Sequence, residues 1–422
     1  MNSSLSWADS YRALIERLPG LVAAAQLTVG GFSSCTDVYL SLHAVIDRLR
    51  AGAPAGGPAS SVLDELERRA SSGLGGELAV DWPQGPEWID RLVTGRRAVG
   101  GTSLQAAQML ATLGAPALAS LEDRSASQID VIHPGVLIAS SDGPVPRSSI
   151  TAMGTGRPPH YIFEYAAGQS IGGRPVPRSE RTILRFDHSD LQHDREFDRL
   201  SVELSPTAGA GIICGFNEVP PPMIAAELDY ATSIARAWRK AGLGLVHLEL
   251  GDFADEQQRD LTIERALPAV SSFGMSLSEL RGLVPDGQAP DDAAIGLAEA
   301  DGLSRVCVHA DEWAMAVTRD DPDRELEALQ AGCLLAAARA STGDFTVPRQ
   351  LPDKARFTQP PMEAIRRSGA WSIACCAVPY LEQPAATIGL GDTFLAGTLL
   401  VLGGATTAAR RLGTKRDGPW LQ

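Results

Sequence analysis

Apolar runs and amphipathic segments alternate along much of the chain. The apolar runs are short and end near glycine or a polar residue, which predicts buried strands. They lie at 27–31, 210–215, 243–250 and 306–309. The segments with helical spacing of apolar positions lie at 103–113, 223–241, 325–341 and 392–402. This alternation predicts an α/β fold with a mostly parallel sheet, in which ligands bind at the carboxyl ends of the strands.

Two stretches interrupt the alternation. Residues 51–97 open with a Gly/Pro/Ala-rich sequence, and residues 155–204 contain short β-like runs around Gly/Pro turns. Because 422 residues exceed what one ordinary core needs, we expect a second, smaller domain. The predicted lid comprises 31–98 and 155–204, and the predicted large domain comprises 1–30, 99–154 and 205–422.

The composition is that of a globular protein with an excess of acidic residues. Hydrophobic residues make up 44% and charged residues 21% of the chain, and its net charge is −14. Binding of nucleic acid over a broad surface needs clustered basic residues, so this charge argues against that class of partner. A small anionic substrate stays possible, because backbone N–H groups and one or two arginines suffice to bind it.

Cysteine spacing and the length of the apolar runs argue against further classes of protein. The six cysteines, at positions 35, 214, 307, 333, 375 and 376, include no C-x-x-C pair, so neither a zinc site nor a disulfide framework is indicated. The first residues lack the pattern of a signal peptide, and no apolar run reaches the ~18 residues of a membrane span. We therefore expect a cytoplasmic location and no membrane partner.

The strongest candidate site is the glycine-rich segment before the last apolar helix. In Gly389-Leu390-Gly391-Asp392, small residues let the backbone approach a phosphoryl group, and the N–H groups at the helix start form an anion hole. Asp392 is placed to accept a proton from an attacking hydroxyl. The alternative is that Asp392 only caps the helix after a glycine turn.

Two further patterns contain carboxylates. His247 and Glu249 are two residues apart on a predicted strand and project from the same face, and Glu279 follows in Ser276-Leu-Ser-Glu279. Glu249 and Glu279 are candidates for binding Mg²⁺, which prefers waters and phosphate oxygens as its main ligands. Alternatively, Glu249 ends a strand, and Ser276 and Glu279 form a helix capping box.

A glycine turn follows the first predicted strand, at Gly30 and Gly31, and leads to Asp37. A second glycine pair occurs at Gly100 and Gly101. Glycine at a strand end lets the backbone approach a ligand, and the Asp37 carboxylate could accept hydrogen bonds from two sugar hydroxyl groups. Asp37 could equally be a solvated turn residue.

In this order along the chain, the motifs resemble those of the ADP-dependent glucokinase and phosphofructokinase family within the ribokinase superfamily. The resemblance runs from about residue 27 to about residue 405 and includes further segments between the motifs above. These segments are Pro159–Glu164, Pro177–Ile183, Ile212–Asn217 and Val308–Ala310.

The resemblance implies a ribokinase-like, Rossmann-type three-layer sandwich with a smaller β-containing lid. It also implies an enzyme that transfers a phosphoryl group from ADP to a hexose or sugar phosphate, with Mg²⁺ bound and AMP as product. Glucose and fructose 6-phosphate are the nearest precedents for the acceptor. The implied roles are metal binding for Glu249 and Glu279, nucleotide binding for Arg181 and His309, and substrate binding for Asp37, Gly101, Thr102 and Asn217.

Three positions depart from the family pattern. Ser276 and Thr102 replace asparagines, and Asn217 stands where the family has a sugar-binding glutamine. The family's sugar-contacting glutamate of the first lid segment has two possible counterparts, Glu77 and Glu87. Two other classes of protein stay open: an ATP-dependent sugar or nucleoside kinase of the same fold, and a non-catalytic sugar- or nucleotide-binding regulator.

Overall fold

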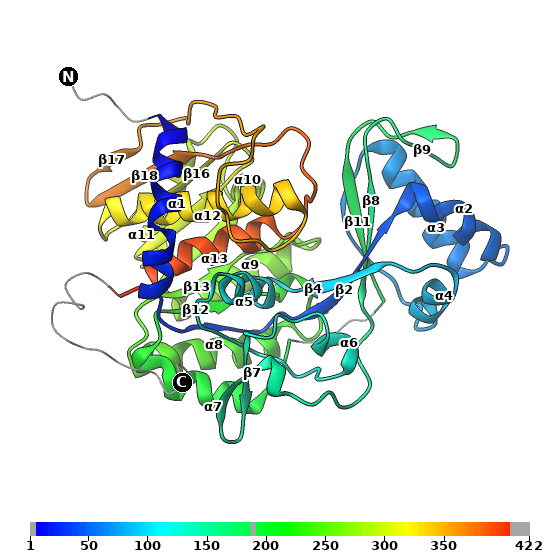
Figure 1. The fold of residues 1–422 in the computed structure, drawn as a ribbon, viewed down its shortest axis with the longest axis horizontal. Helices are drawn as coiled ribbons and strands as arrows, with labels where there is room; N and C mark the ends of the chain where they lie inside the picture. Colours follow the sequence, from blue (N-terminus) through cyan, green and yellow to red (C-terminus); the bar gives the residue numbers. More distant parts are fainter. Residues whose placement is uncertain (1–5, 187–190, 406–422) are drawn as a thin grey trace.

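The strands form two sheets that lie side by side (Figure 1). The computed structural model describes residues 6–186 and 191–405. In these ranges one sheet has eleven strands and the other has five. A two-stranded hairpin, β9 (Ser170–Ile171) and β10 (Arg174–Pro175), lies at the tip of the smaller sheet.

The centre of the large sheet is parallel. In order across the sheet, its parallel strands are β15 (Arg305–His309), β14 (Ser272–Ser276), β13 (Val246–Glu249), β12 (Ala210–Ile213), β1 (Thr28–Gly30), β5 (Ala117–Ala119) and β6 (Leu137–Ser140). Antiparallel strands extend its edges: β16 (Trp313–Thr318), β18 (Trp371–Ala377) and β17 (Ile365–Ser368) on one side, and β7 (Gly143–Pro146) on the other. The predicted mostly parallel sheet is confirmed.

Helices cover both faces of the large sheet, because successive strand residues point to opposite sides. Ile212 packs into the core on one face and Ile213 into the core on the other. One layer of helices comprises α1 (Trp7–Ala24), α5 (Thr102–Leu113), α6 (Ala126–Ile129), α12 (Pro322–Thr342) and α13 (Leu390–Leu402). The opposite layer comprises α7 (Arg195–Leu204), α8 (Ile224–Ala241), α9 (Glu256–Ala266), α10 (Leu277–Leu283) and α11 (Pro290–Ala300). The large sheet is therefore the middle layer of a three-layer sandwich.

The smaller sheet is covered by helices on one face only. Its strands, in order, are β3 (Gly76–Ala79), β11 (Glu180–Arg185), β8 (His160–Tyr165), β2 (Cys35–Ser41) and β4 (Arg96–Gly100). Apolar residues such as Val38, Phe163 and Leu184 pack under α2 (Leu42–Gly52), α3 (Pro58–Ser72) and α4 (Gly85–Leu92). The Gly/Pro-rich sequence at the start of residues 51–97 is the turn between α2 and α3, and the stretch contains two helices that its composition did not predict.

The predicted boundaries of the lid differ at two places from the division of the chain between the two sheets. Residues 195–204, which the sequence pattern assigns to the lid, form α7, and α7 contacts α8 and β6 of the large body. The Phe197 and Leu200 side chains belong to the core of the large sheet, which explains this position. Residues 99 and 100, which the pattern assigns to the large domain, end β4 of the smaller sheet.

Helices α12 and α13 pack in direct backbone contact. A Cβ atom added at Gly397 of α13 would lie 2.6 Å from the Gly332 Cα atom of α12. A Cβ atom at Gly332 would lie 2.6 Å from the Phe394 ring. No side chain can enter this contact without separating the helices, so the two glycines fix how α13 lies on the body.

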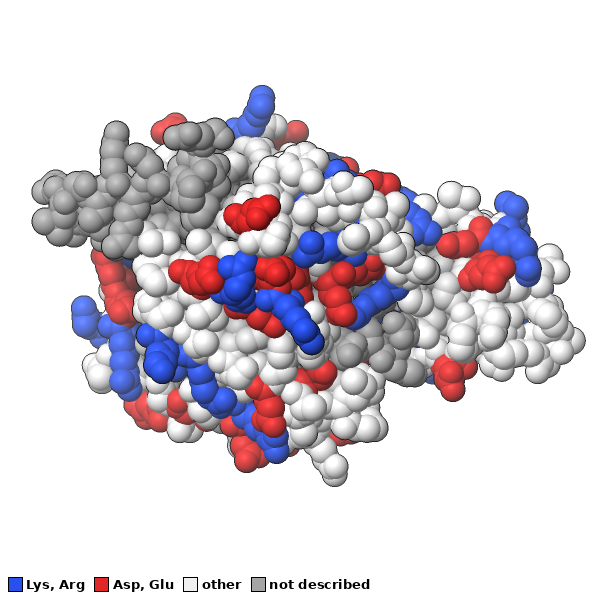
Figure 2. Space-filling model, turned by 90° about the horizontal axis from the view of Figure 1, so that it is seen from below, with Lys and Arg blue, Asp and Glu red and all other residues white. Residues whose placement is uncertain are grey.

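Charged side chains of both signs are present on one face of the protein (Figure 2). On the face drawn in Figure 2, basic and acidic side chains lie interleaved. Among the described helices, none combines the length and the hydrophobicity that crossing a membrane would require.

We expect Gly397→Ala to destabilise the fold by about 1–3 kcal/mol, because the added methyl group meets backbone atoms that cannot rotate away. Chemical unfolding monitored by circular dichroism measures this change. The matched control is Gly296→Ala in α11, where a Cβ atom meets nothing within 4 Å. The control should be neutral or stabilising by up to about 1 kcal/mol, the helix preference of alanine over glycine. Equal stabilities of the two variants would contradict the proposed contact.

Candidate active site

The parallel strands β13 to β15 open at their carboxyl ends onto a cavity of about 1150 Å³. Its lining comes from both sheets: Gly251 after β13, Ser276 at the end of β14, His309 at the end of β15, Gly391 at the start of α13, and Arg181 of β11 in the smaller sheet. This is where the α/β pattern predicts ligand binding. A second, much smaller cavity lies nearby under β2 and β8.

Helix α13 is capped at its start by Gly389, at a position where any other residue would be strained. Gly389 has a φ angle of 69°, and a Cβ atom there would overlap the side chains of Gln105 and Arg339. The Arg339 guanidinium donates one hydrogen bond of 2.8 Å to the Gly389 carbonyl and one of 3.0 Å to the Thr393 hydroxyl. Arg339 therefore holds the turn and the first turn of the helix together.

The backbone N–H groups at this helix start are open to the cavity. The first hydrogen bond of α13 runs from the Thr393 N–H to the Gly389 carbonyl, so Leu390, Gly391 and Asp392 have no acceptor inside the helix. Leu390 and Gly391 line the cavity. An anion there would meet these N–H groups and the positive end of a 13-residue helix.

Asp392 is a residue of the first helical turn and does not cap the helix. The N-cap position is occupied by Gly389, and no side chain caps the helix there, so the alternative that Asp392 is only an N-cap is wrong. Burial raises the pKa of Asp392, and the Arg339 charge and a hydrogen bond with Thr102 oppose this shift. Thr102, which the sequence places in the substrate site, thus contacts the predicted base.

Glu249 is held between two histidines. Its Oε2 atom lies 2.8 Å from His247 Nε2, and its Oε1 atom lies 3.4 Å from His309 Nε2. The other ring nitrogen of His247 lies 2.8 Å from the Ser272 hydroxyl, which fixes the ring. Burial opposes ionisation of Glu249, but the two histidines outweigh it and lower its pKa to about 2. Glu249 is therefore charged over the whole physiological pH range.

Glu279 belongs to a capping box and also faces the cavity. Its carboxylate accepts a 2.6 Å hydrogen bond from the Ser276 N–H, and the Ser276 hydroxyl accepts one of 3.2 Å from the Glu279 N–H. The capping-box interpretation is correct, and both residues line the cavity. Burial raises the pKa of Glu279, and the negative charge of Glu249 adds to this shift.

Asp37 is a buried strand residue and not a solvated turn residue. It lies in β2 with 4% of its surface exposed, next to the Cys35 thiol and the His160 ring. Burial, together with the negative charge of Glu218, raises the pKa of Asp37 to about 7. A Cβ atom at Gly100 would overlap the Asp37 carboxylate, so the second glycine pair leaves room for this carboxylate.

The two counterparts of the lid glutamate have different positions. Glu77 of β3 pairs with Arg185, at 3.2 Å between Oε2 and Nε, and burial raises its pKa. Arg185 also donates a 3.3 Å hydrogen bond to the Glu218 carbonyl, so Glu77 and Glu218 share one cation. Glu87 is exposed in the first turn of α4. Glu77, and not Glu87, is therefore linked through Arg185 to Glu218, whose negative charge acts on Asp37.

The remaining predicted residues also lie at the junction of the sheets. Asn217 follows β12, and a Cβ atom at Gly251 would lie 2.6 Å from its side chain. Gly101, with a φ angle of 82°, begins α5 where a Cβ atom would clash with the Ser33 carbonyl. The Arg181 side chain lines the large cavity, and its Nε atom is buried without a hydrogen-bond partner.

Sequence patterns did not reveal four residues of the site. Arg339 and Gln105 come from the interiors of α12 and α5, which read as ordinary amphipathic helices. Glu218 follows Asn217 in a short 3₁₀ turn. The sequence contains one indication of Arg185: it is four residues from Arg181 on a predicted strand, so the two side chains project from the same face.

These features define a class of protein: an α/β sandwich with a second sheet, in which a helix start preceded by glycine lines a cavity at the carboxyl ends of the parallel strands. Residues 29–401 match the family model described as the ADP-specific phosphofructokinase/glucokinase conserved region. The chain belongs to this family, as its motifs predict.

Curated relatives resemble the chain over part of their length. An ADP-dependent glucose/glucosamine kinase of Pyrococcus furiosus is 24% identical over 268 residues, which cover 56% of this chain and 58% of the relative. An ADP-specific phosphofructokinase of the same organism is 25% identical over 281 residues, which cover 57% of this chain and 62% of the relative. The chain thus matches less than two thirds of either relative.

Solved structures resemble the chain over nearly all of it. An ADP-dependent kinase in complex with fructose 6-phosphate and ADPβS has a TM-score of 0.75 at 17% identity and covers 95% of this chain and 99% of its own. A phosphofructokinase of Pyrococcus horikoshii with AMP has a TM-score of 0.70 at 19% identity, covering 90% and 98%. The predicted fold class, a ribokinase-like three-layer sandwich with a smaller β-containing part, is confirmed.

We expect Asp37→Asn to stabilise the protein at pH 8 and to leave its stability nearly unchanged at pH 4. The raised pKa means that folded Asp37 keeps a proton between about pH 4 and 7 that the unfolded chain releases, so wild-type stability falls as the pH rises through this window. At pH 8 the gain could reach about 4 kcal/mol, since three pKa units correspond to that energy. Urea unfolding at both pH values tests this, and a variant less stable than wild type at pH 8 contradicts it.

Proposed function

We propose that this protein is an ADP-dependent sugar kinase, which transfers the terminal phosphoryl group of ADP to a hydroxyl group of a hexose or sugar phosphate and releases AMP. The observation that carries the proposal is the start of α13. Leu390 and Gly391, whose backbone N–H groups have no acceptor in the helix, line a cavity large enough for a nucleotide and an acceptor, and the partly buried Asp392 follows them in the same helical turn.

The donor end of the site lies between β13, β15 and α13. The diphosphate would meet the N–H groups of Leu390 and Gly391, with Arg181 reaching it from the smaller sheet. The unpartnered, buried Nε atom of Arg181 supports this role, because a buried donor without an acceptor is costly unless a ligand supplies one. The His309 ring lies 3.4 Å from a Cβ atom built at Gly391, so it would lie beside a phosphate bound at that residue.

The carboxylates at this end fit Mg²⁺. Glu279 faces the cavity and Glu249 is ionised behind it, and carboxylate oxygens are the ligands that Mg²⁺ takes, usually together with water and phosphate oxygens. Mg²⁺ bound there would neutralise charge on the phosphate oxygens. The serine at position 276, in place of the family's asparagine, keeps the helix cap intact, because serine and asparagine cap helices about equally well.

The acceptor end lies on the other side of Asp392. The charges of Asp392 and Arg339 act on Asp37, and those of Glu249 and His309 act on Asp392, so Asp392 is within electrostatic reach of both groups. Asp37, once ionised, would accept hydrogen bonds from sugar hydroxyls, and Asn217, Gly101 and Glu77 would complete this side.

The proton transfer requires one base in a dry site. As the acceptor oxygen attacks the terminal phosphorus atom, its proton would pass to the Asp392 carboxylate, while the Gly389 to Gly391 backbone stabilises charge on the transferred group. The raised pKa of Asp392 makes it a stronger base than an exposed carboxylate. The polar face of the smaller sheet would cover the reacting groups as a lid and exclude water.

Two relatives with different acceptors limit what can be proposed about the sugar. One is named as a glucose/glucosamine kinase and the other as a phosphofructokinase, at nearly equal identity. We therefore propose the acceptor as a class, a hexose or its phosphate. The ADP branch is favoured over an ATP-dependent kinase by the family match and by the histidine-bound Glu249.

We expect ADP with Mg²⁺ to raise the melting temperature of the protein more than ATP with Mg²⁺ does at the same concentration. A ligand that binds only the folded state stabilises it by mass action, so the shift ranks the donors without knowledge of the acceptor. Differential scanning fluorimetry with ADP, ATP, AMP and GDP makes the comparison. A larger shift with ATP would instead assign the protein to the ATP-dependent kinases.

We expect Asp392→Asn to lower turnover by roughly 10²-fold or more, since general-base assistance contributes about 10²–10⁴-fold. ADP affinity should stay within a few-fold of wild type, because the backbone N–H donors are unchanged. The assay couples AMP release to the sugar that a substrate screen identifies, and calorimetry gives ADP affinity. Asp292→Asn, an exposed position in α11, is the matched control for loss of one charge. Near-full turnover of Asp392→Asn would eliminate Asp392 as the base.

A further inference from the structure

Three side chains with metal-binding atoms converge on the cleft-facing side of the smaller sheet. Cys35 Sγ lies 3.5 Å from His160 Nδ1 and 3.6 Å from Asp37 Oδ1, and His160 Nδ1 lies 3.9 Å from Asp37 Oδ1. Among the described residues this is the one cluster of three or more His, Cys, Asp or Glu ligand atoms that all lie within 4.8 Å of one another.

The sheet brings the three together through its register. Cys35 and Asp37 are two residues apart on β2 and therefore point to the same face. His160 begins β8, which runs parallel to β2, and it pairs directly with Asp37. Residues that are 123 positions apart along the chain thus become neighbours, although the cysteine spacing alone indicates no such group.

The distances from Cys35 Sγ to His160 Nδ1 and to Asp37 Oδ1 are those between the ligands of one zinc ion, whereas the 3.9 Å between His160 Nδ1 and Asp37 Oδ1 is longer. Zinc binds sulfur at about 2.3 Å and nitrogen or oxygen at about 2.0–2.2 Å, and tetrahedral angles then separate the ligand atoms by roughly 3.3–3.6 Å. The His160 and Asp37 side chains would have to approach one another by roughly 0.3–0.6 Å to match this geometry. A thiolate, an imidazole and a carboxylate are ligands that zinc takes together, whereas Mg²⁺ avoids sulfur.

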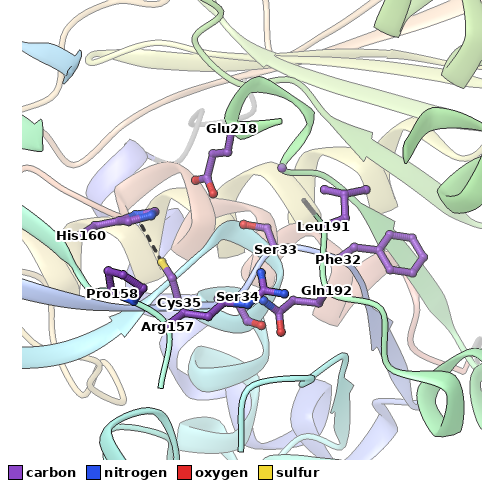
Figure 3. A pocket seen from close by; sticks show the side chains of 11 residues that line it. Phe32, Ser33, Ser34, Cys35, Arg157, Pro158, His160, Leu191, Gln192 and Glu218 are labelled. Atoms are coloured by element: carbon purple, nitrogen blue, oxygen red, sulfur yellow. Dashed lines mark hydrogen bonds between the residues drawn. The ribbon is translucent and has the colours of Figure 1, made fainter. Parts of the chain in front are cut away.

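Space for an ion is present next to the cluster. Cys35 and His160 line a cavity of about 20 Å³, enough for one particle the size of a water molecule. Figure 3 shows the two side chains directed toward one another and the Glu218 carboxyl group directed into the same pocket. A water molecule can therefore supply a fourth ligand. A Cβ atom at Gly100 would lie 2.6 Å from Cys35 Sγ, so the glycine leaves this side open.

We propose that Cys35, Asp37 and His160 bind one zinc ion, at a site separate from the carboxylates Glu249 and Glu279. The site is held by two adjacent strands and needs no large rearrangement. Because zinc occupies the Asp37 carboxylate, bound zinc excludes a sugar from the acceptor end of the cleft. This last consequence rests on the proposed function, whereas the metal site itself does not.

The direct test is zinc binding by the metal-free full-length protein, without nucleotide or sugar. Titration against a chromophoric zinc chelator should give one equivalent of bound zinc per chain. Co²⁺ in place of zinc should give a thiolate-to-metal charge-transfer band in the near ultraviolet. Absence of stoichiometric zinc binding, or a cobalt complex without the thiolate band, would overturn the proposal.

Variants assign the ligands. Cys35→Ser and His160→Asn should each weaken zinc binding at least ~10-fold, since even removal of an outer partner of a metal ligand costs about 10–100-fold. Matched controls are Cys375→Ala, a buried cysteine of β18, and His43→Asn, an exposed histidine of α2. Both controls should bind zinc as the wild type does. Unchanged affinity in Cys35→Ser would show that the zinc binds elsewhere.

A kinetic measurement separates this site from the proposed reaction. If a sugar acceptor is identified, zinc should inhibit competitively with the sugar and not with ADP, and the inhibition should be relieved in His160→Asn. Competition with ADP alone would place the inhibitory zinc at the phosphates and contradict a site at the acceptor end. If no kinase activity is found, the chelator titration still decides whether the metal site exists.

Discussion

Helix α13 can hold its start at the cavity only because it touches α12 backbone to backbone. Gly332 and Gly397 remove the side chains that would otherwise separate the helices. That approach puts Arg339 of α12 within hydrogen-bond distance of the Gly389 carbonyl and the Thr393 hydroxyl. Arg339 thereby holds the glycine turn against the first turn of α13. The geometry of this helix start is thus a property of the helix pair and not of the glycine motif alone.

Buried carboxyl groups along the cleft differ in protonation because cations are distributed unevenly among them. Two histidines contact the Glu249 carboxylate and lower its pKa to about 2. Asp37 has a thiol and a more distant histidine beside it, and burial raises its pKa to about 7. Arg185 forms an ion pair with Glu77 and donates a hydrogen bond to the Glu218 backbone carbonyl. Neighbouring histidines and burial therefore shift the pKa values of Glu249 and Asp37 in opposite directions.

The smaller sheet has an apolar face and a polar face. Along β2, Val38 and Leu40 enter the core under the helices, whereas Asp37 and Tyr39 point the other way. The Arg96 guanidinium lies 4.5 Å above the Tyr39 ring and extends the polar face onto β4. Asp37 is buried on this polar face, whereas Arg96 is exposed.

The sequence by itself determined the α/β class, most strand and helix positions around the large sheet, and the residues at the strand ends, because these follow from local periodicity and glycine placement. His247 and Glu249 are one example, since a spacing of two on a strand fixes their common face. Tertiary structure decided which distant residues meet. Arg339 at Gly389, Thr102 at Asp392, Glu77 rather than Glu87 at Arg185, and His160 beside Cys35 depend on helix packing and strand register. Those arrangements are set by contacts between segments far apart in the chain, which no local pattern encodes.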